Sequence, residues 1–208
     1  MKIETLINDR NDCSDQKSET LFSDFDPDER IVSFEYLDQD YDPDHRLEYL
    51  QIADFQFLFE QSTWQSLNEF EKKEILQHFK EAVATDLELN NIPELGYYYE
   101  ENPVDFGIYS SADDKISINY FQLDYPENIV KTIAHEMRHC WQTERINLLE
   151  DVQNEFDKML KFNDENYIQP YDNYCAYWNQ PMEIDARLYS DHVMSTVFGN
   201  LKDEEQKL

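Results

Sequence analysis

Two histidines four residues apart, in the segment His135-Glu136-Met137-Arg138-His139, place the strongest constraint on this chain. On an α-helix, side chains at this spacing project from one face, one turn apart. Two imidazoles in that arrangement can bind one tetrahedral metal ion. The pattern therefore predicts an unbroken helix from about Pro126 to Arg145, with the proline in the first turn, where its missing N–H is not needed.

The residues around the histidines predict a helix with two different sides. Glu136 lies about 100° around the helix from His135, so its carboxylate can reach the outer edge of the same site and accept a proton from an activated water. The apolar side, which we expect to be buried, consists of Val130, Ile133, Ala134, Met137 and Trp141. The polar side consists of Thr132, His135, Glu136, His139 and Gln142. The alternative is a solvated face that carries two histidines, but the chain has only 5 histidines to place.

Two histidines leave a catalytic zinc ion one protein ligand short, because such sites usually have three. Gln142 and Arg145 stand where a third histidine would follow nearby, so we expect an acidic ligand. The candidates are Glu150, Glu155, Asp157, Glu165 and Glu183. Glu183 is the best placed of them, because Pro181 predicts the start of a helix that runs to about Phe198 and carries Glu183 in its first turn.

The hydrophobic pattern predicts an α+β domain. Apolar residues at helical spacing indicate helices over residues 45–60 and 66–89 and a further helical segment over 146–160. Short aromatic and β-branched runs indicate strands at 96–99, 107–110 and 115–120, and Ala112-Asp113-Asp114 predicts a hairpin turn between the last two. Residues 163–174 are expected to form a loop.

The two ends of the chain differ in composition. Residues 1–44 are polar and acidic, with one strand-like run from Ile31 to Leu37, so we expect an arm that is partly disordered or docked on the rest. Residues 45–208 are expected to form a single domain.

Charge and cysteine content restrict the partners and the compartment. The chain has 46 acidic and 17 basic residues, a formal charge of −29, which disfavours binding to nucleic acids and anionic membranes and favours basic partners. Its 3 cysteines include no Cys-x-x-Cys pair, and Cys140 is expected to be a buried structural thiol. We find no apolar signal segment at the start and no apolar run long enough for a membrane span, so the expected location is the cytoplasm.

Over residues 60–200 the sequence resembles the minimal-domain gluzincin metallopeptidases. The resemblance rests on the hairpin Gly107-Ile108-Tyr109…Ile116-Ser117-Ile118-Asn119, on the helix from Thr132 to Gln142, and on Pro181-x-Glu183-x-Asp185-Ala186. It implies a zincin-like fold with a small, mostly antiparallel sheet. It also implies one zinc ion held by His135, His139 and Glu183, with Asp185 as the rival to Glu183.

The resemblance further implies a hydrolase that cleaves peptide bonds through a zinc-activated water, with Glu136 as the general base. Tyr174 or Tyr177 could donate a hydrogen bond to the developing oxyanion. The strand from Ile116 to Tyr120 is expected to edge the cleft, where a peptide, basic by preference, could add by β-pairing. Arg187 stands where an Asp or Asn often orients a zinc-bound histidine, so that support is expected from Asp185 or a backbone carbonyl.

Two other functions compete with the peptidase hypothesis. The charge of −29 is also consistent with an acidic interaction protein, such as an inhibitor or a DNA mimic, that uses a catalytically weak or inactive zincin fold as a scaffold. A purely structural zinc ion is the third hypothesis, although structural sites usually have four protein ligands, often thiolates. Zinc content and the effect of Glu136→Gln separate these hypotheses.

Overall fold

The computed structural model describes residues 52–101, 106–148 and 154–205, and these form a mixed α+β structure, as predicted. The elements in chain order are α3 (Ile52–Phe59), α4 (Gln61–Ser66), α5 (Glu69–Asp86), β1 (Glu94–Tyr98), β2 (Gly107–Ser110), β3 (Lys115–Asn119), the 3-10 helix η1 (Tyr120–Asp124), α6 (Pro126–Leu148), α7 (Glu155–Glu165), α8 (Tyr174–Trp178) and α9 (Pro181–Glu205). The predicted arm 1–44 and the candidate ligand Glu150 lie outside the described residues.

Contacts within the chain divide the described residues into two compact units. The sheet unit comprises residues 52–145 and 186–205, without residues 102–105. The helical unit comprises residues 146–148 and 154–185. The expectation of a single domain over 45–208 stays a prediction.

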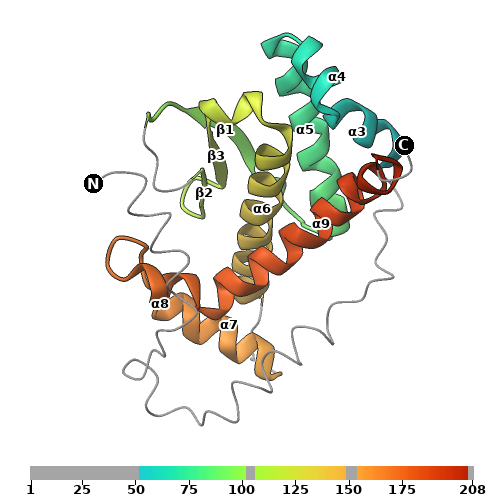
Figure 1. Ribbon diagram of the computed structural model, residues 1–208. Coiled ribbons are helices and arrows are strands. Elements are labelled where there is room, and N and C mark those ends of the chain that lie inside the picture. The colour runs from blue at the N-terminus through green and yellow to red at the C-terminus, as the bar shows by residue number, and fades with distance from the viewer. Residues whose placement is uncertain (1–51, 102–105, 149–153, 206–208) are drawn as a thin grey trace. The chain divides into compact units, whose positions relative to one another are not determined.

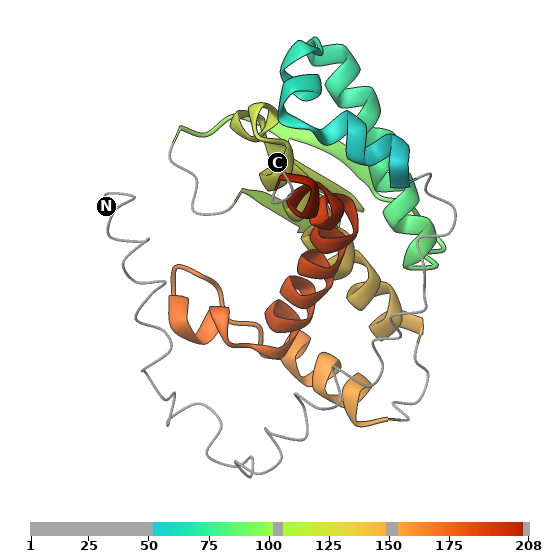
Figure 2. The same cartoon turned by 45° about the vertical axis from the view of Figure 1, so that its right-hand side comes forward.

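Helices α3, α4 and α5 lie together in the sheet unit (Figure 2). Asn68 caps the start of α5: its side chain accepts from the Glu71 N–H while the Glu71 carboxylate accepts from the Asn68 N–H. The helix ends earlier than its sequence pattern predicts, because Glu88 adopts a left-handed conformation with φ 52°. The N–H groups of Glu88 and Leu89 then bond back to Thr85 and Ala84, which satisfies the last carbonyls of the helix.

Aromatic side chains fill the space between these three helices. Phe59 is buried and contacts the rings of Phe55, Trp64 and Phe79, with ring centroids 5.3–6.0 Å apart. The indole N–H of Trp64, which is also buried, donates to the Leu123 carbonyl at 2.6 Å, so burying the indole leaves no polar group unpaired. Phe59, Trp64 and Phe79 are therefore part of the core of this unit, whereas Phe57 and Phe70 are exposed.

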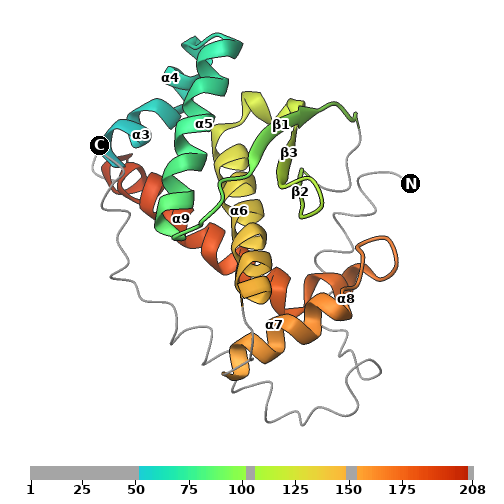
Figure 3. The same ribbon diagram turned by 180° about the vertical axis from the view of Figure 1, so that it is seen from behind.

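The described residues contain one three-stranded sheet, in the order β1-β3-β2 (Figure 1). The predicted hairpin is present, with β2 antiparallel to β3 and Ile108 opposite Ser117. Strand β1, however, is parallel to β3, so the prediction of a mostly antiparallel sheet is wrong. The chain runs from α5 into β1 (Figure 3). The hairpin of β2 and β3 follows, and its second strand, β3, pairs with β1, so that β3 lies between the two earlier strands.

A second expectation about the sheet is also wrong. Strand β3 does not edge a cleft, because it pairs with β1 on one side and β2 on the other. Of the described strands, β1 and β2 lie at the two edges of the sheet. The last residue of β3 is linked to the segment that follows β1, since the Asn119 side chain donates to the Glu100 carbonyl at 2.9 Å.

Helix α6 buries its predicted apolar side, with Ile133, Ala134 and Met137 excluded from solvent. Trp141 is only half-buried, and the Arg138 guanidinium lies over its ring, 3.8 Å from the centroid. The opposite side of the helix is not a solvated face either, since Glu136 and Gln142 are buried as well. Within the described ranges, no helix is long and apolar enough to cross a membrane.

Two phenylalanines on α5 test this account of the core. Phe79 is fully buried, whereas Phe70 is 71% exposed. Phe79→Ala is expected to lower the free energy of unfolding by about 3–5 kcal/mol, because it removes a packed ring and leaves a cavity. Phe70→Ala on the same helix is the control and should change it by no more than about 0.5 kcal/mol. Urea denaturation measures both, and equal effects would contradict the packing described.

Candidate metal centre

His135 and His139 face each other across one turn of α6. Their Nε2 atoms are 3.1 Å apart, and their ring centroids are 4.7 Å apart with an interplanar angle of 85°. Two zinc–nitrogen bonds of about 2.05 Å at a tetrahedral angle place the nitrogens about 3.3 Å apart. The two imidazoles are thus already spaced to serve one ion.

Gln142 holds the His139 ring in the orientation that such an ion requires. Its Oε1 lies 2.8 Å from His139 Nδ1, and the amide is completely buried. When that oxygen accepts the Nδ1–H, the tautomer leaves the Nε2 lone pair available as a ligand. The support expected from Asp185 or a backbone carbonyl stays a prediction beside this contact. The spacing of three residues between His139 and Gln142, which places them on one helix face, was the signal for it.

The Glu136 carboxylate is held against the sheet within the same unit. It is 7% exposed, and its Oε2 accepts the backbone N–H of Tyr109 at 2.9 Å. Strand β2 comes very close to α6 at Gly107, where an added Cβ would lie 2.5 Å from Thr132 Cγ2 and 3.3 Å from Glu136 Cγ. Glu136 therefore extends over Gly107 and reaches the next outward-facing N–H of β2.

In the helical unit, a buried amide network fixes the start of α9, where Glu183 lies in the first turn. Asn163 on α7 accepts the Met182 N–H at 2.8 Å and donates to Gln180 Oε1 at 2.9 Å. Gln180 also pairs with both backbone groups of Ile168. The network satisfies N–H and amide groups that would otherwise be buried without partners, and it fixes the backbone that carries Glu183.

Tyr167 is a contact of Glu183 that sequence reasoning missed. Its hydroxyl donates to Glu183 Oε1 at 2.5 Å, and the carboxylate is 1% exposed. A hydrogen bond to one oxygen orients a carboxylate so that its other oxygen can bind a ligand. Tyr167 lies in a loop 16 residues before Glu183, in a chain with 14 tyrosines, so no pattern distinguishes it.

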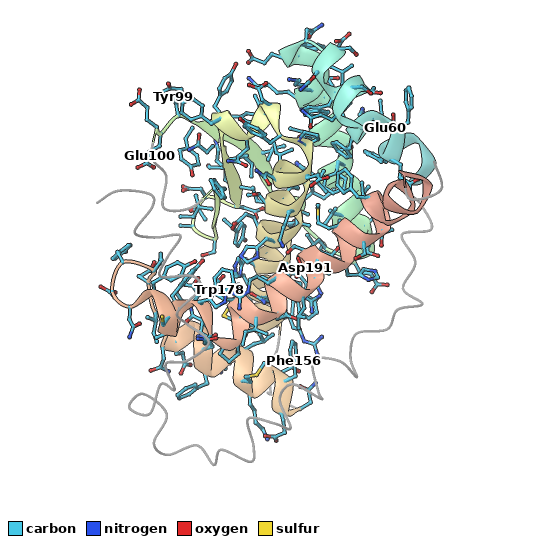
Figure 4. The ribbon with its side chains drawn as sticks, in the orientation of Figure 1. Glu60, Tyr99, Glu100, Phe156, Trp178 and Asp191 are labelled. Atoms are coloured by element: carbon cyan, nitrogen blue, oxygen red, sulfur yellow. The ribbon has the colours of Figure 1, made fainter. Side chains whose placement is uncertain are left out.

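The other predicted site residues lie on α8 and α9. Tyr174 and Tyr177 lie on α8, where Tyr174 packs against Tyr177 and against the Trp178 ring. Trp178 is labelled in Figure 4. Their suggested oxyanion role stays a prediction. Asp185 lies buried one turn into α9, two residues after Glu183, and Arg187 follows on the same helix.

Cys140, the residue after His139, is the buried free thiol that the sequence predicts. Burial raises the pKa of this thiol to about 11, an effect that a hydrogen bond with Tyr109 partly offsets. Burial and the contact with Cys140 also raise the pKa of the Tyr109 hydroxyl well above its usual range. Both side chains are therefore neutral at physiological pH, and they contact each other between β2 and α6 rather than supply a nucleophile.

No protein-family model matches this chain, and neither a curated protein nor a solved structure was found that is similar to it.

The raised pKa of Cys140 makes a prediction about its reactivity. A thiol with a pKa of about 11 is ionised in only about one molecule in a thousand at pH 8, and the thiolate is the form that reacts. Iodoacetamide at pH 8 should therefore leave Cys140 almost unmodified in the folded chain and modify it after unfolding in urea. Peptide mass spectrometry measures the modified fraction. Alkylation of the folded protein as fast as that of a free cysteine peptide would contradict the burial of this thiol.

Proposed function

We propose that this protein is a zinc-dependent peptidase in which His135, His139 and Glu183 hold the metal and Glu136 transfers protons. The observation that carries the proposal is the spacing of 3.1 Å between the two Nε2 atoms, close to the edge of a zinc tetrahedron. The same pair lies beside a buried carboxylate, which the peptidase chemistry requires as a general base.

Glu183 is the third ligand in this proposal. His135, His139 and Glu183 each offer one ligand atom to this group of possible metal ligands. Among the described residues, Asp185 and the other candidate acids are not part of this group. Two imidazoles and one carboxylate form a donor set that suits zinc, and Gln142 and Tyr167 each hold one of the three donors by a hydrogen bond.

The number of donors favours a catalytic ion over a structural one. Structural zinc sites are usually closed by four protein ligands, whereas catalytic sites keep one position for water or substrate. In the part of the chain that the structure describes, the group has three members and contains no cysteine. Cys140, the free thiol closest in sequence, is protonated and packs among buried residues.

When bound, zinc acts as a Lewis acid that lowers the pKa of a water molecule towards about 7 and polarises the carbonyl to be cleaved. Glu136 accepts the proton of the attacking water and passes it to the leaving amine. The Tyr109 N–H holds one carboxylate oxygen, so the other is the one that exchanges protons. In the described sheet the outer edge of β2 faces no further strand, so its backbone groups other than the Tyr109 N–H would pair with an extended peptide, and the charge of −29 favours basic segments.

Metal analysis and peptide cleavage together test this function on the full chain. The parent should contain close to one zinc ion per chain, and His135→Ala should lose it. Glu136→Gln should retain the zinc and lose turnover of a mixed peptide library by about 100-fold or more, because only the proton acceptor is removed. A parent without zinc would contradict the metal site. Bound zinc with equal turnover by the parent and Glu136→Gln would contradict the assigned role of Glu136, and no turnover by either would favour the scaffold hypothesis.

The role of Gln142 gives a separate prediction. Gln142→Leu should weaken Zn²⁺ binding by about 10–100-fold, because His139 loses the acceptor that fixes its tautomer, whereas Gln142→Glu should retain the affinity. Gln122→Leu is the control, since Gln122 is a buried glutamine on η1. Competition with a zinc-binding dye measures the affinities. Equal affinity in the parent and in Gln142→Leu would show that the His139 contact does not support the metal.

A further inference from the structure

We infer that strand β2 positions the general base, with Gly107 providing the space and the Tyr109 N–H providing the hydrogen bond for Glu136. This inference rests on the proposed function and extends it to strand residues that act through Glu136. It concerns residues of the sheet unit alone.

The direction of the Tyr109 N–H follows from the strand pairing. Alternate residues of an antiparallel edge strand direct their N–H and C=O groups towards the neighbouring strand and away from it. In the described sheet, β2 pairs with β3 alone, and Phe106 bonds to Asn119 of β3. Tyr109, an odd number of residues later, directs its N–H away from β3, where Glu136 accepts it at 2.9 Å. The helix carboxylate thus occupies one donor on the open edge of β2.

Gly107 makes this contact sterically possible. A Cβ at this position would lie 2.5 Å from Thr132 Cγ2, 3.1 Å from Ile118 Cδ1 and 3.3 Å from Glu136 Cγ. Thr132 and Glu136 both belong to α6, so a methyl group here would force the helix away from the strand in the turn that carries His135. The glycine is needed for this close approach and not for an unusual backbone conformation, since no glycine in the described residues has a positive φ.

The hydrogen bond restricts the carboxylate in a way that serves proton transfer. The Glu side chain has three rotatable bonds, and freezing them in the reactive orientation before the substrate binds removes an entropic cost from the reaction. Thr132, one turn before Glu136, donates its own hydroxyl to the Asn128 carbonyl at 2.8 Å and presents its methyl group to Gly107. The strand and the helix therefore fix both ends of the Glu136 side chain.

The first test measures the hydrogen bond without measuring activity. Amide hydrogen exchange in the full chain should show the Tyr109 N–H protected in the parent and in Glu136→Gln, whose carbonyl still accepts it. Protection should fall by at least about 10-fold in Glu136→Ala and in Gly107→Ala. Equal exchange in the parent and in Glu136→Ala would overturn the inference, whether or not the protein is a peptidase.

The second test separates positioning from folding. Gly107→Ala should keep its zinc and its KM within about twofold while kcat falls by about 10–100-fold, as expected for a misplaced catalytic group. Gly96→Ala is the matched control, because its Cβ would meet chiefly the flexible end of Lys115 on the same sheet. Gly107→Ala combined with Thr132→Ser, which removes the methyl group of the closest contact, should regain both Tyr109 protection and kcat.

The outcomes distinguish the two proposals. A parent with neither zinc nor turnover contradicts the proposed function, and amide exchange then still decides whether β2 holds Glu136. An active parent in which Gly107→Ala loses Tyr109 protection and keeps its kcat overturns the positioning role. Loss of zinc together with kcat in Gly107→Ala, without recovery in the double variant, overturns it as well, because the glycine would then support the fold of α6 in general.

Discussion

The close packing of α6 on strand β2 is the constraint on which the candidate centre depends. At Gly107 the strand approaches Thr132 and Glu136 so closely that a side chain would not fit, and the strand N–H at Tyr109 bonds to the Glu136 carboxylate. This contact fixes the position of α6 along its axis and its rotation about that axis at the turn that carries the two histidines. The Nε2 atoms, 3.1 Å apart, then face one point in space.

Much of this arrangement follows from local sequence. The spacing of His135 and His139 determines their common face once the segment is helical, and the hairpin between β2 and β3 follows from the turn at Ala112-Asp113-Asp114. The parallel pairing of β1 with β3 did not follow, because it joins segments about 20 residues apart through contacts that no local pattern encodes.

The residues that contact the proposed ligands and the general base also divide into those that local sequence predicts and those that it does not. Gln142 could be found from its helical spacing to His139, since both lie on α6. Tyr167 and the Tyr109 N–H could not, because each reaches its carboxylate from a different segment of the chain. The proposed third ligand, Glu183, was selected by resemblance and by its place after Pro181, not by any rule of spacing to the histidines. Local periodicity thus predicts which elements form, and tertiary contacts decide which side chains meet.

X-ray absorption at the zinc edge of the purified full chain tests the central claim most directly. The account predicts bound zinc with two imidazole nitrogens at about 2.0–2.1 Å and oxygen ligands at about 2.0–2.2 Å, with imidazole scattering reduced in His139→Ala. Absence of zinc, or a sulfur shell at about 2.3 Å, would contradict a centre built from His135, His139 and Glu183.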